Sequence, residues 1–369
     1  MGFLRFFLAF SVVNVHANLL GFNLMYADVA VQSFYVISGF YMAMVLNEKY
    51  NRPGVTYTDF LLSRFFRIIP AYILVVFLTV SAAAVAWFGF GVTIPPLQHW
   101  QVLFNKLSLT TIISVIFIQF SLVGTELIHY FTLNASGGLT FTAHFSQEPI
   151  KLWRLLTVPQ AWTLALEFYF YLLAPFIVRR SVGFIFGLIV TSFLVRLILA
   201  LQFDVRFDPW SYRFFPSELL FFLAGSLTYR LSSPKILAIS RFNIRLITGI
   251  CFILIMAAGV IARYGHVGHF YSVSPLFIGL LFLWLPKLFL LTKNKKIDRY
   301  IGELSYPLYI SHVLVIWLAE LVFVKGSLQH RIIVGLGSIL LSILIYELLE
   351  RRVDDFRHRL FVTKEKKIE

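Results

Sequence analysis

Ten long apolar runs constrain the fold of this chain more than any other feature of its sequence. Each run is close to the ~20 residues that an α-helix needs to cross the hydrocarbon core of a bilayer. Only 14% of the residues are charged, whereas a soluble domain carries roughly 25%. We therefore predict an all-α, polytopic transmembrane helix bundle of about ten helices. The runs cover approximately 3–22, 26–47, 69–91, 161–178, 184–202, 214–231, 243–262, 271–291, 304–323 and 331–350.

The positive charges between these runs indicate how the bundle is oriented. Most lysines and arginines fall in alternate loops, and such loops face the cytoplasm by the positive-inside rule. This pattern predicts an even number of crossings with both termini cytoplasmic. It also predicts one transmembrane domain over 1–350 and a basic cytoplasmic tail over 351–369. The basic residues assigned to inner loops are Lys49, Arg52, Arg64, Arg67, Arg179, Arg180, Lys235, Arg241, Arg245, Lys287, Lys293, Lys295, Lys296 and Arg299.

A long segment over 92–160 interrupts this regular alternation. It contains a further apolar stretch, about 107–123, which would reverse the orientation of every later loop if it crossed the membrane alone. We therefore expect 107–123 to be re-entrant or interfacial. The stretch from Asn134 to Gln147 is rich in Thr, Ser and Gly and is predicted to be an exposed outer loop.

The net charge of +14 would suit a nucleic-acid-binding protein if the basic residues formed one polar face. They form short clusters between apolar runs instead, which favours lipid headgroups and phosphates as partners and argues against nucleic acid. A single cysteine, Cys251, excludes an intramolecular disulfide. No His-Glu-x-x-His or Cys-x-x-Cys pair proposes a metal, and two outer-loop histidines, His266 and His269, are weak candidates.

Ionisable residues inside the predicted spans are candidates for function, because inserting each one costs at least ~2.5 kcal/mol. Arg5 and His16 are eleven positions apart, which places them on one helix face about 16 Å apart along the axis. Arg5 would then lie at the cytoplasmic interface and His16 near mid-membrane. His16 is either a histidine hydrogen-bonded between helices or a neutral general base.

Four more ionisable residues near or inside the predicted spans are candidates for function. Arg64 and Arg67 are three apart on a predicted helix and point the same way. They suit the phosphates of coenzyme A, although a cytoplasmic flank also carries arginines for topology alone. Glu167, in an aromatic span, is either an interhelical contact or part of a site. His312 is also intramembrane, and its simplest role is structural.

Six separate segments resemble motifs of the membrane acyltransferase 3 family, which includes polysaccharide and peptidoglycan O-acetyltransferases. Together they span most of the chain. Arg5 through His16 matches the Arg-x10-His motif, Ser33 through Phe40 matches the Phe-Phe-x-x-Ser-Gly-Phe segment, and Arg64 through Arg67 matches the Arg-x-x-Arg motif. The other matches are Trp162–Tyr171, Ser305–His312 and Glu350-Arg351. Gln32 replaces an acidic residue that is common in the family, so Asp28 or Glu167 becomes the candidate carboxylate partner of His16.

The resemblance implies a cytoplasmic acyl-CoA donor, acetyl-CoA by default, and no permanently bound cofactor. The acceptor would be a hydroxyl of a cell-surface or lipid-linked glycan, and the protein would reside in the bacterial cytoplasmic (inner) membrane. His16 and Glu167 would be catalytic, with His16 as general base, and transfer would be direct or through an acyl-histidine. The residues expected to bind the donor are Arg5, Arg64, Arg67, Ser38 and Gly39, and those expected to support the site are Gln32, Trp162, Tyr309 and His312.

A different class of function remains compatible with the same residues. Intramembrane histidines and arginines also line the pathways of transporters, so the chain could carry an anionic solute. Two symmetric halves with paired interrupted helices would favour that alternative, and no internal repeat of this kind is visible in the sequence.

Overall fold

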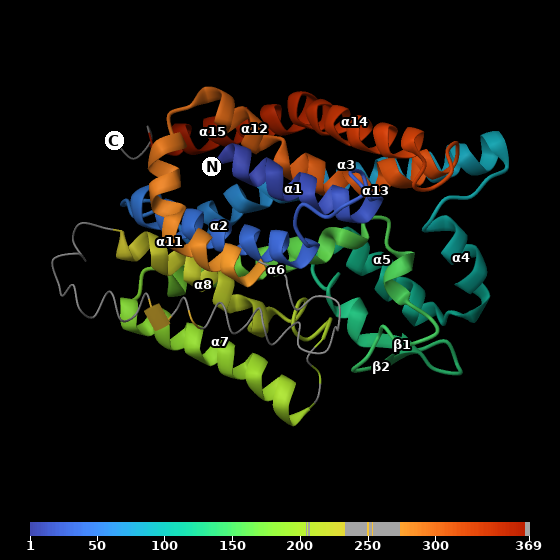
Figure 1. The fold of residues 1–369 in the computed structure, drawn as a ribbon, viewed down its shortest axis with the longest axis horizontal. Coiled ribbons are helices and arrows are strands. Elements are labelled where there is room, and N and C mark those ends of the chain that lie inside the picture. The colour runs from blue at the N-terminus through green and yellow to red at the C-terminus, as the bar shows by residue number, and fades with distance from the viewer. Residues whose placement is uncertain (204, 206, 233–248, 251–252, 254–273, 366–369) are drawn as a thin grey trace.

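The computed structural model describes residues 1–203, 205, 207–232, 249–250, 253 and 274–365. This part of the chain is mostly helical, and its helices lie side by side in a bundle with a smaller lobe at one end (Figure 1). The bundle comprises α1 (Gly2–Ala17), α2 (Ala27–Glu48), α3 (Tyr57–Phe90), α6 (Trp162–Ile177), α7 (Val182–Gln202), α8 (Phe215–Leu231), α11 (Ser274–Thr292), α12 (Lys296–Glu303), α13 (Ser305–Glu320), α14 (Leu328–Ile345) and α15 (Arg351–Glu365). A π-helical segment, Tyr346–Glu350, joins α14 to α15.

Nine of the ten predicted runs coincide with a helix in the described residues. The run at 243–262, with Cys251, His266 and His269, lies outside the described residues. Within the described chain, five helical segments are long and apolar enough to cross a membrane, so the protein is an integral membrane protein; the further crossings, to about ten, stay a prediction. These segments are Ala27–Glu48, Tyr57–Phe90, Val182–Gln202, Lys296–Glu320 and Leu328–Arg357.

The degree of burial separates the inner helices from the outer ones. In α2, 78% of the apolar window is buried inside the protein, whereas the values are 28% for α7 and 22% for the segment that begins with α14. A helix that is apolar on all sides but buried on only one must present the rest to lipid. We therefore assign α2 to the centre of the bundle, and α7 and α14 to its lipid-facing periphery.

Helix α3 has 34 residues and is about 51 Å long, which exceeds the ~30 Å hydrocarbon core. It starts twelve residues before the predicted run, at a capping box in which Thr56 accepts from the Asp59 amide and Asp59 accepts from the Thr56 amide. The additional turns carry Arg64 and Arg67. These arginines are therefore held on a rigid helix rather than on a loop.

The lobe consists of the segment between α3 and α6. It contains α4 (Leu97–Leu103), α5 (Leu109–Ser121), four short 3₁₀ turns and a hairpin of β1 (Phe131–Leu133) and β2 (Leu139–Phe141). Part of the segment predicted to be an exposed loop is thus a β-strand, since β2 lies within it. The turn at Asn134–Ser136 is exposed, as the sequence predicted. With 13 residues, α5 is about 20 Å long, too short to cross the bilayer alone, and its re-entrant or interfacial placement stays a prediction.

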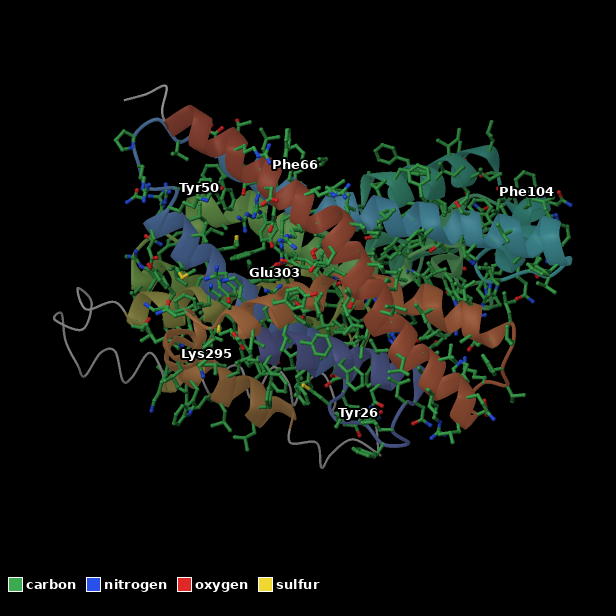
Figure 2. The ribbon with its side chains drawn as sticks, turned by 90° about the horizontal axis from the view of Figure 1, so that it is seen from above. Tyr26, Tyr50, Phe66, Phe104, Lys295 and Glu303 are labelled. Atoms are coloured by element: carbon green, nitrogen blue, oxygen red, sulfur yellow. The ribbon has the colours of Figure 1, made fainter. Side chains whose placement is uncertain are left out.

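The two ends of the molecule carry different segments. Figure 2 shows Tyr50 and Lys295 at one end and Phe104, in the lobe, at the other. Tyr50 and Lys295 belong to loops that the charge pattern assigns to the cytoplasm. The start of α1 lies at the same end, and it is capped by a carboxylate from α12.

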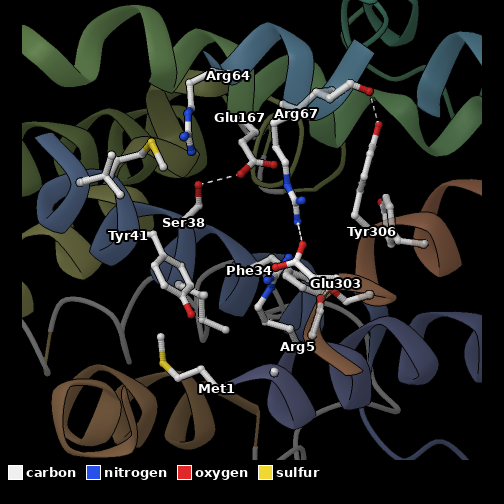
Figure 3. A pocket seen from close by; sticks show the side chains of 18 of the residues that line it. Met1, Arg5, Phe34, Ser38, Tyr41, Arg64, Arg67, Glu167, Glu303 and Tyr306 are labelled. Carbon is white, nitrogen blue, oxygen red and sulfur yellow. Dashed lines mark hydrogen bonds and ion pairs between the residues drawn. The ribbon is translucent and has the colours of Figure 1, made fainter. Parts of the chain in front are cut away.

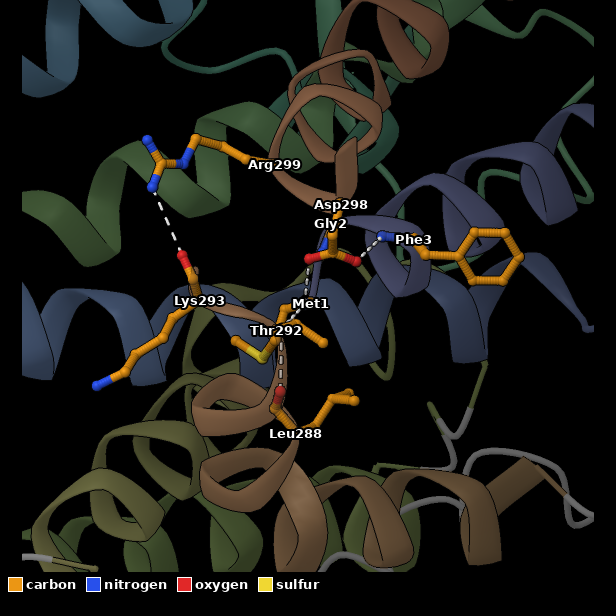
Figure 4. Close-up of polar contacts among 8 residues, drawn as sticks. All are labelled: Met1, Gly2, Phe3, Leu288, Thr292, Lys293, Asp298 and Arg299. Atoms are coloured by element: carbon orange, nitrogen blue, oxygen red, sulfur yellow. Dashed lines mark hydrogen bonds and ion pairs between the residues drawn. The ribbon is translucent and has the colours of Figure 1, made fainter. Parts of the chain in front are cut away.

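That cap joins two segments far apart in the sequence. Asp298 accepts hydrogen bonds from the backbone amides of Gly2, at 2.8 Å, and Phe3, at 2.9 Å, as Figure 4 shows. The first amides of a helix have no partner within the helix, and a carboxylate there also complements the helix dipole. A Cβ atom on Gly2 would lie 1.5 Å from the Asp298 carbonyl oxygen, so glycine permits this approach.

Candidate active site

A cavity of about 510 Å³ lies between the helices at the Lys295 end of the bundle. Figure 3 shows Arg5, Arg64 and Arg67 converging on it from α1 and α3. Six basic side chains line the cavity against four acidic ones, so its wall is positively charged. The basic residues are Arg5, Arg64, Arg67, Lys293, Arg299 and Arg357, and the acidic ones are Glu167, Asp298, Glu303 and Asp354.

The two arginines of α3 have different partners. Arg67 forms an ion pair with Glu303 at 2.5 Å and a longer one with Asp354 at 3.7 Å. Within the described part of the chain, Arg64 donates a hydrogen bond only to the Ser63 hydroxyl, at 3.2 Å, and its buried Nε has no hydrogen-bond partner. Among the described residues, no carboxylate pairs with Arg64 or Arg5. On α1 and α3, Arg5 and Arg64 are thus cations available to an anionic ligand, whereas Arg67 is already neutralised.

Glu167 projects from α6 into the same cavity (Figure 3). Its Oε1 accepts from the Ser38 hydroxyl at 2.7 Å and from the Tyr171 hydroxyl at 2.5 Å. Two such donors stabilise a carboxylate without a cation. The structure therefore brings together Ser38 and Glu167, which the sequence placed in one site, and adds Tyr171, which it did not.

Tyr309 and Thr163 line the cavity at its deep end. The hydroxyl of Thr163 lies 3.0 Å from that of Tyr309, and both oxygens are close to the Gln160 carbonyl. The Tyr309 ring lies 6.0 Å from the ring of His312, on the next turn of α13. His312, one of the two histidines that the sequence singled out, therefore lies directly behind the part of the cavity wall that Tyr309 forms.

His16 and His312 form a hydrogen-bonded pair, with their rings nearly coplanar, that does not line the cavity. Their ring centroids are 5.0 Å apart, and Nδ1 of His16 lies 2.7 Å from Nε2 of His312. Nδ1 of His312 lies 2.7 Å from the Tyr309 carbonyl oxygen. His312 is fully buried, whereas His16 retains accessible surface. The hydrogen-bond partner of His16 is thus a histidine, and Glu167, one of the expected carboxylates, is bonded to Ser38 instead.

Besides the two histidines, three further predicted site residues lie outside the cavity. Gly39 packs against the backbone of α8. Gln32 donates to Glu218 at 3.1 Å. Trp162 lies under the guanidinium of Arg213, which is 4.2 Å from the centre of the indole ring. We assign these residues to the support of the site.

Sequence reasoning missed a buried ion pair beside Gln32. Arg196 of α7 donates to Glu218 of α8 at 2.5 Å, and both side chains are almost completely buried. Arg196 lies well inside one predicted apolar run and Glu218 near the start of the next, so the criterion that singled out His16 would also have found this pair. The cavity residues Lys293, Arg299 and Arg357 were missed as ligand-binding candidates for another reason, since in the sequence they resemble ordinary cytoplasmic flanks.

The fold and the site define an integral membrane protein with a charged cavity that ends beside a pair of histidines. The chain belongs to the acyltransferase 3 family, whose profile, described as an acyltransferase domain, matches residues 1–347. It is also similar to an uncharacterized protein of Aquifex aeolicus, with 27% identity over 210 residues, which are 55% of this chain and 90% of the relative. No solved structure matches the chain. The protein is therefore a membrane acyltransferase.

Proposed function

We propose that this acyltransferase moves an acyl group, acetyl by default, from acyl-CoA to a hydroxyl of a cell-surface or lipid-linked glycan in the bacterial cytoplasmic membrane. The observation that carries the proposal is the cavity itself. Its wall presents Arg64 and Arg5 without carboxylate partners, and its floor, at Tyr309, lies directly before the histidine pair. The arrangement suits a ligand with phosphates at one end and a reactive group at the other.

The donor would enter from the end that holds Lys293 and Arg299. Its phosphates would contact Arg64 and Arg5, because arginine binds phosphate oxygens in a bidentate manner. Its thioester would lie near Ser38 and Tyr309. The amides and hydroxyls of the pantetheine arm need polar partners in this apolar surrounding, and hydroxyls that line the deep half of the cavity supply them.

The chemistry requires one base. The acceptor hydroxyl oxygen attacks the thioester carbonyl carbon while Nε2 of His16 takes the hydroxyl proton. The new C–O bond forms, the C–S bond breaks, and the leaving thiolate takes the proton from His16. Glu167, held by Ser38 and Tyr171, would fix the helix positions around the thioester rather than exchange a proton itself.

The test is release of free coenzyme A by purified protein in detergent, with acetyl-CoA and with or without a soluble sugar acceptor. We expect acceptor-dependent release that His16→Ala abolishes, while the mutant remains monodisperse. His330→Gln is the control, because His330 is another histidine of the bundle but is fully buried on α14, away from the cavity. It should retain activity.

Two other results would count against the proposal. Full activity in His16→Ala would remove this residue from the mechanism. Uptake of an anionic tracer into proteoliposomes without thioester cleavage would indicate a transporter instead. If the protein does release coenzyme A, glycan analysis of a deletion strain against a complemented strain would identify the acceptor.

A further inference from the structure

The hydrogen bonds of the histidine pair determine which ring nitrogens carry protons. A backbone carbonyl can only accept, so the contact between Nδ1 of His312 and the Tyr309 carbonyl requires a proton on Nδ1 of His312. His312 is fully buried, and a charged imidazolium there would be strongly disfavoured by the lost hydration. His312 is therefore neutral, and its Nε2 carries a lone pair.

That lone pair fixes the state of the neighbouring ring. Nε2 of His312 is 2.7 Å from Nδ1 of His16, and two lone pairs cannot face each other at this distance. His16 must hold its proton on Nδ1 and donate it to His312. In neutral His16, Nε2 is then unprotonated.

The geometry points to His312 as a positioning residue that keeps Nε2 of His16 in the proton-accepting form; this inference rests on the proposed function, in which His16 is the base. A carboxylate commonly serves this purpose for a catalytic histidine. In this protein the neutral imidazole of His312 takes the place of that carboxylate. The position before the Phe-Phe-x-x-Ser-Gly-Phe segment, which is commonly acidic in the family, is Gln32, and its side chain is bonded to Glu218.

The two histidines are not interchangeable. His312 has no accessible surface, and both of its ring nitrogens are engaged, one with Tyr309 and one with His16. His16 has accessible surface, and its Nε2 is directed away from the pair. Proton transfer from a substrate therefore belongs to His16. When His16 is protonated, its Nδ1–H continues to donate to His312, so the ring does not have to turn during the reaction.

Two nearly isosteric substitutions separate this positioning role from a structural one. In His312→Gln, the side-chain amide occupies the place of Nε2, so its oxygen can accept from His16. In His312→Asn, the amide occupies the place of Nδ1, so it can donate to the Tyr309 carbonyl but does not reach His16. We expect kcat to fall by about 100-fold in His312→Asn and by less than about 10-fold in His312→Gln, with the KM for acetyl-CoA unchanged in both.

A spectroscopic readout tests the protonation state without relying on turnover. In protein labelled with ¹⁵N-histidine, the signals of His16 are those that disappear in His16→Gln. They should report the Nδ1–H form in the wild type and in His312→Gln, and the Nε2–H form or a mixture in His312→Asn.

The possible outcomes are distinguishable. Equal or better activity in His312→Asn than in His312→Gln would overturn the positioning role, as would an Nε2–H signal for His16 in the wild type. If the wild type releases no coenzyme A from any acyl-CoA, the proposed function fails, and the ¹⁵N signals still decide whether His312 sets the form of His16. Melting temperatures of both variants within a few degrees of wild type would exclude misfolding as the cause.

Discussion

Gly39 of α2 and Gly225 of α8 form a reciprocal backbone contact. A Cβ atom on Gly39 would lie 1.8 Å from the Phe222 carbonyl oxygen, and one on Gly225 would lie 1.8 Å from the Val36 carbonyl oxygen. Small residues permit such close approach of helices in membranes. Gly39, which the sequence assigned to the donor site, therefore serves the contact between two central helices.

We predict that Gly39→Ala or Gly225→Ala destabilises the protein by about 1–3 kcal/mol or more, because the added methyl meets backbone that no side-chain rotation can move. The measurement is the melting temperature in detergent. Gly187→Ala on α7 is the control, since no atom of another described segment lies within 4 Å of the added Cβ, and it should be neutral or slightly stabilising. Equal changes in melting temperature in all three variants would contradict a role for the Gly39–Gly225 backbone contact in stability.

The arginines of α3 should differ when each is replaced by alanine. Arg64→Ala removes a cation without a carboxylate partner, and we expect acyl-CoA binding to weaken by about 1.5–3 kcal/mol at unchanged stability. Arg67→Ala leaves Glu303 without its cation, although Asp354 keeps its ion pair with Arg357 at 2.9 Å, and should lower the melting temperature as well.

Isothermal titration with acetyl-CoA and thermal melting separate these two effects. Arg180→Ala, an exposed arginine outside the cavity, should change neither quantity. If Arg64→Ala binds the donor as tightly as the wild type, Arg64 has a role in topology alone.

The orientation can be tested by cysteine labelling in intact cells on a background with Cys251 replaced. Ser136→Cys, at the exposed turn of the hairpin, should react with a membrane-impermeant thiol reagent. Asn51→Cys, at the opposite end, should react only after permeabilisation. A reversed pattern would invalidate the predicted orientation, and shielding of position 136 alone would contradict the re-entrant or interfacial assignment of 107–123.

The lobe should lose stability in mild acid. Burial, with a contribution from Arg213, holds the pKa of His129 well below its usual range, although its bond to the Glu126 carbonyl acts in the opposite direction. An unfolded chain therefore binds a proton below about pH 6.5 that the folded lobe does not. Because only the unfolded chain is stabilised by this proton, the free energy of unfolding is unaffected by His129 above that pH and decreases as the pH falls below it.

We expect the melting temperature of the wild type to fall between pH 7.5 and 5.5, by about 2–4 °C for each kcal/mol lost. His129→Gln should show a smaller decrease, because glutamine does not titrate. Parallel pH dependence in both proteins would assign the acid sensitivity to other groups.

Hydrophobicity alone predicted where α2 lies, because its apolar run and its helix have nearly the same limits, 26–47 and Ala27–Glu48. It misplaced the start of α3, since the first three turns are amphipathic and the helix begins at the Thr56–Asp59 capping box, a polar signal. It also extended α1 five residues too far. The Asn18 backbone is left-handed, which ends the helix at Ala17.

The candidate site was predictable only in part. Spacing within one helix placed Arg64 and Arg67 on a common face, and both line the cavity. Spacing cannot predict contacts between helices, so the pairing of His16 with His312, 296 positions apart, was not foreseen. Neither was the pairing of Arg67 with Glu303, because both depend on how α1, α3, α12 and α13 pack.

The early end of α1 has an electrostatic consequence for His16, which occupies the last turn of that helix. The final carbonyl groups of a helix lack partners within it and together act as about half a negative charge. A helix that crossed the whole bilayer would place this charge at the membrane surface, far from the histidine. Because α1 stops at Ala17, the partial charge lies within one turn of His16, where it would stabilise the imidazolium that forms when His16 takes a proton, by about 0.3–1 kcal/mol.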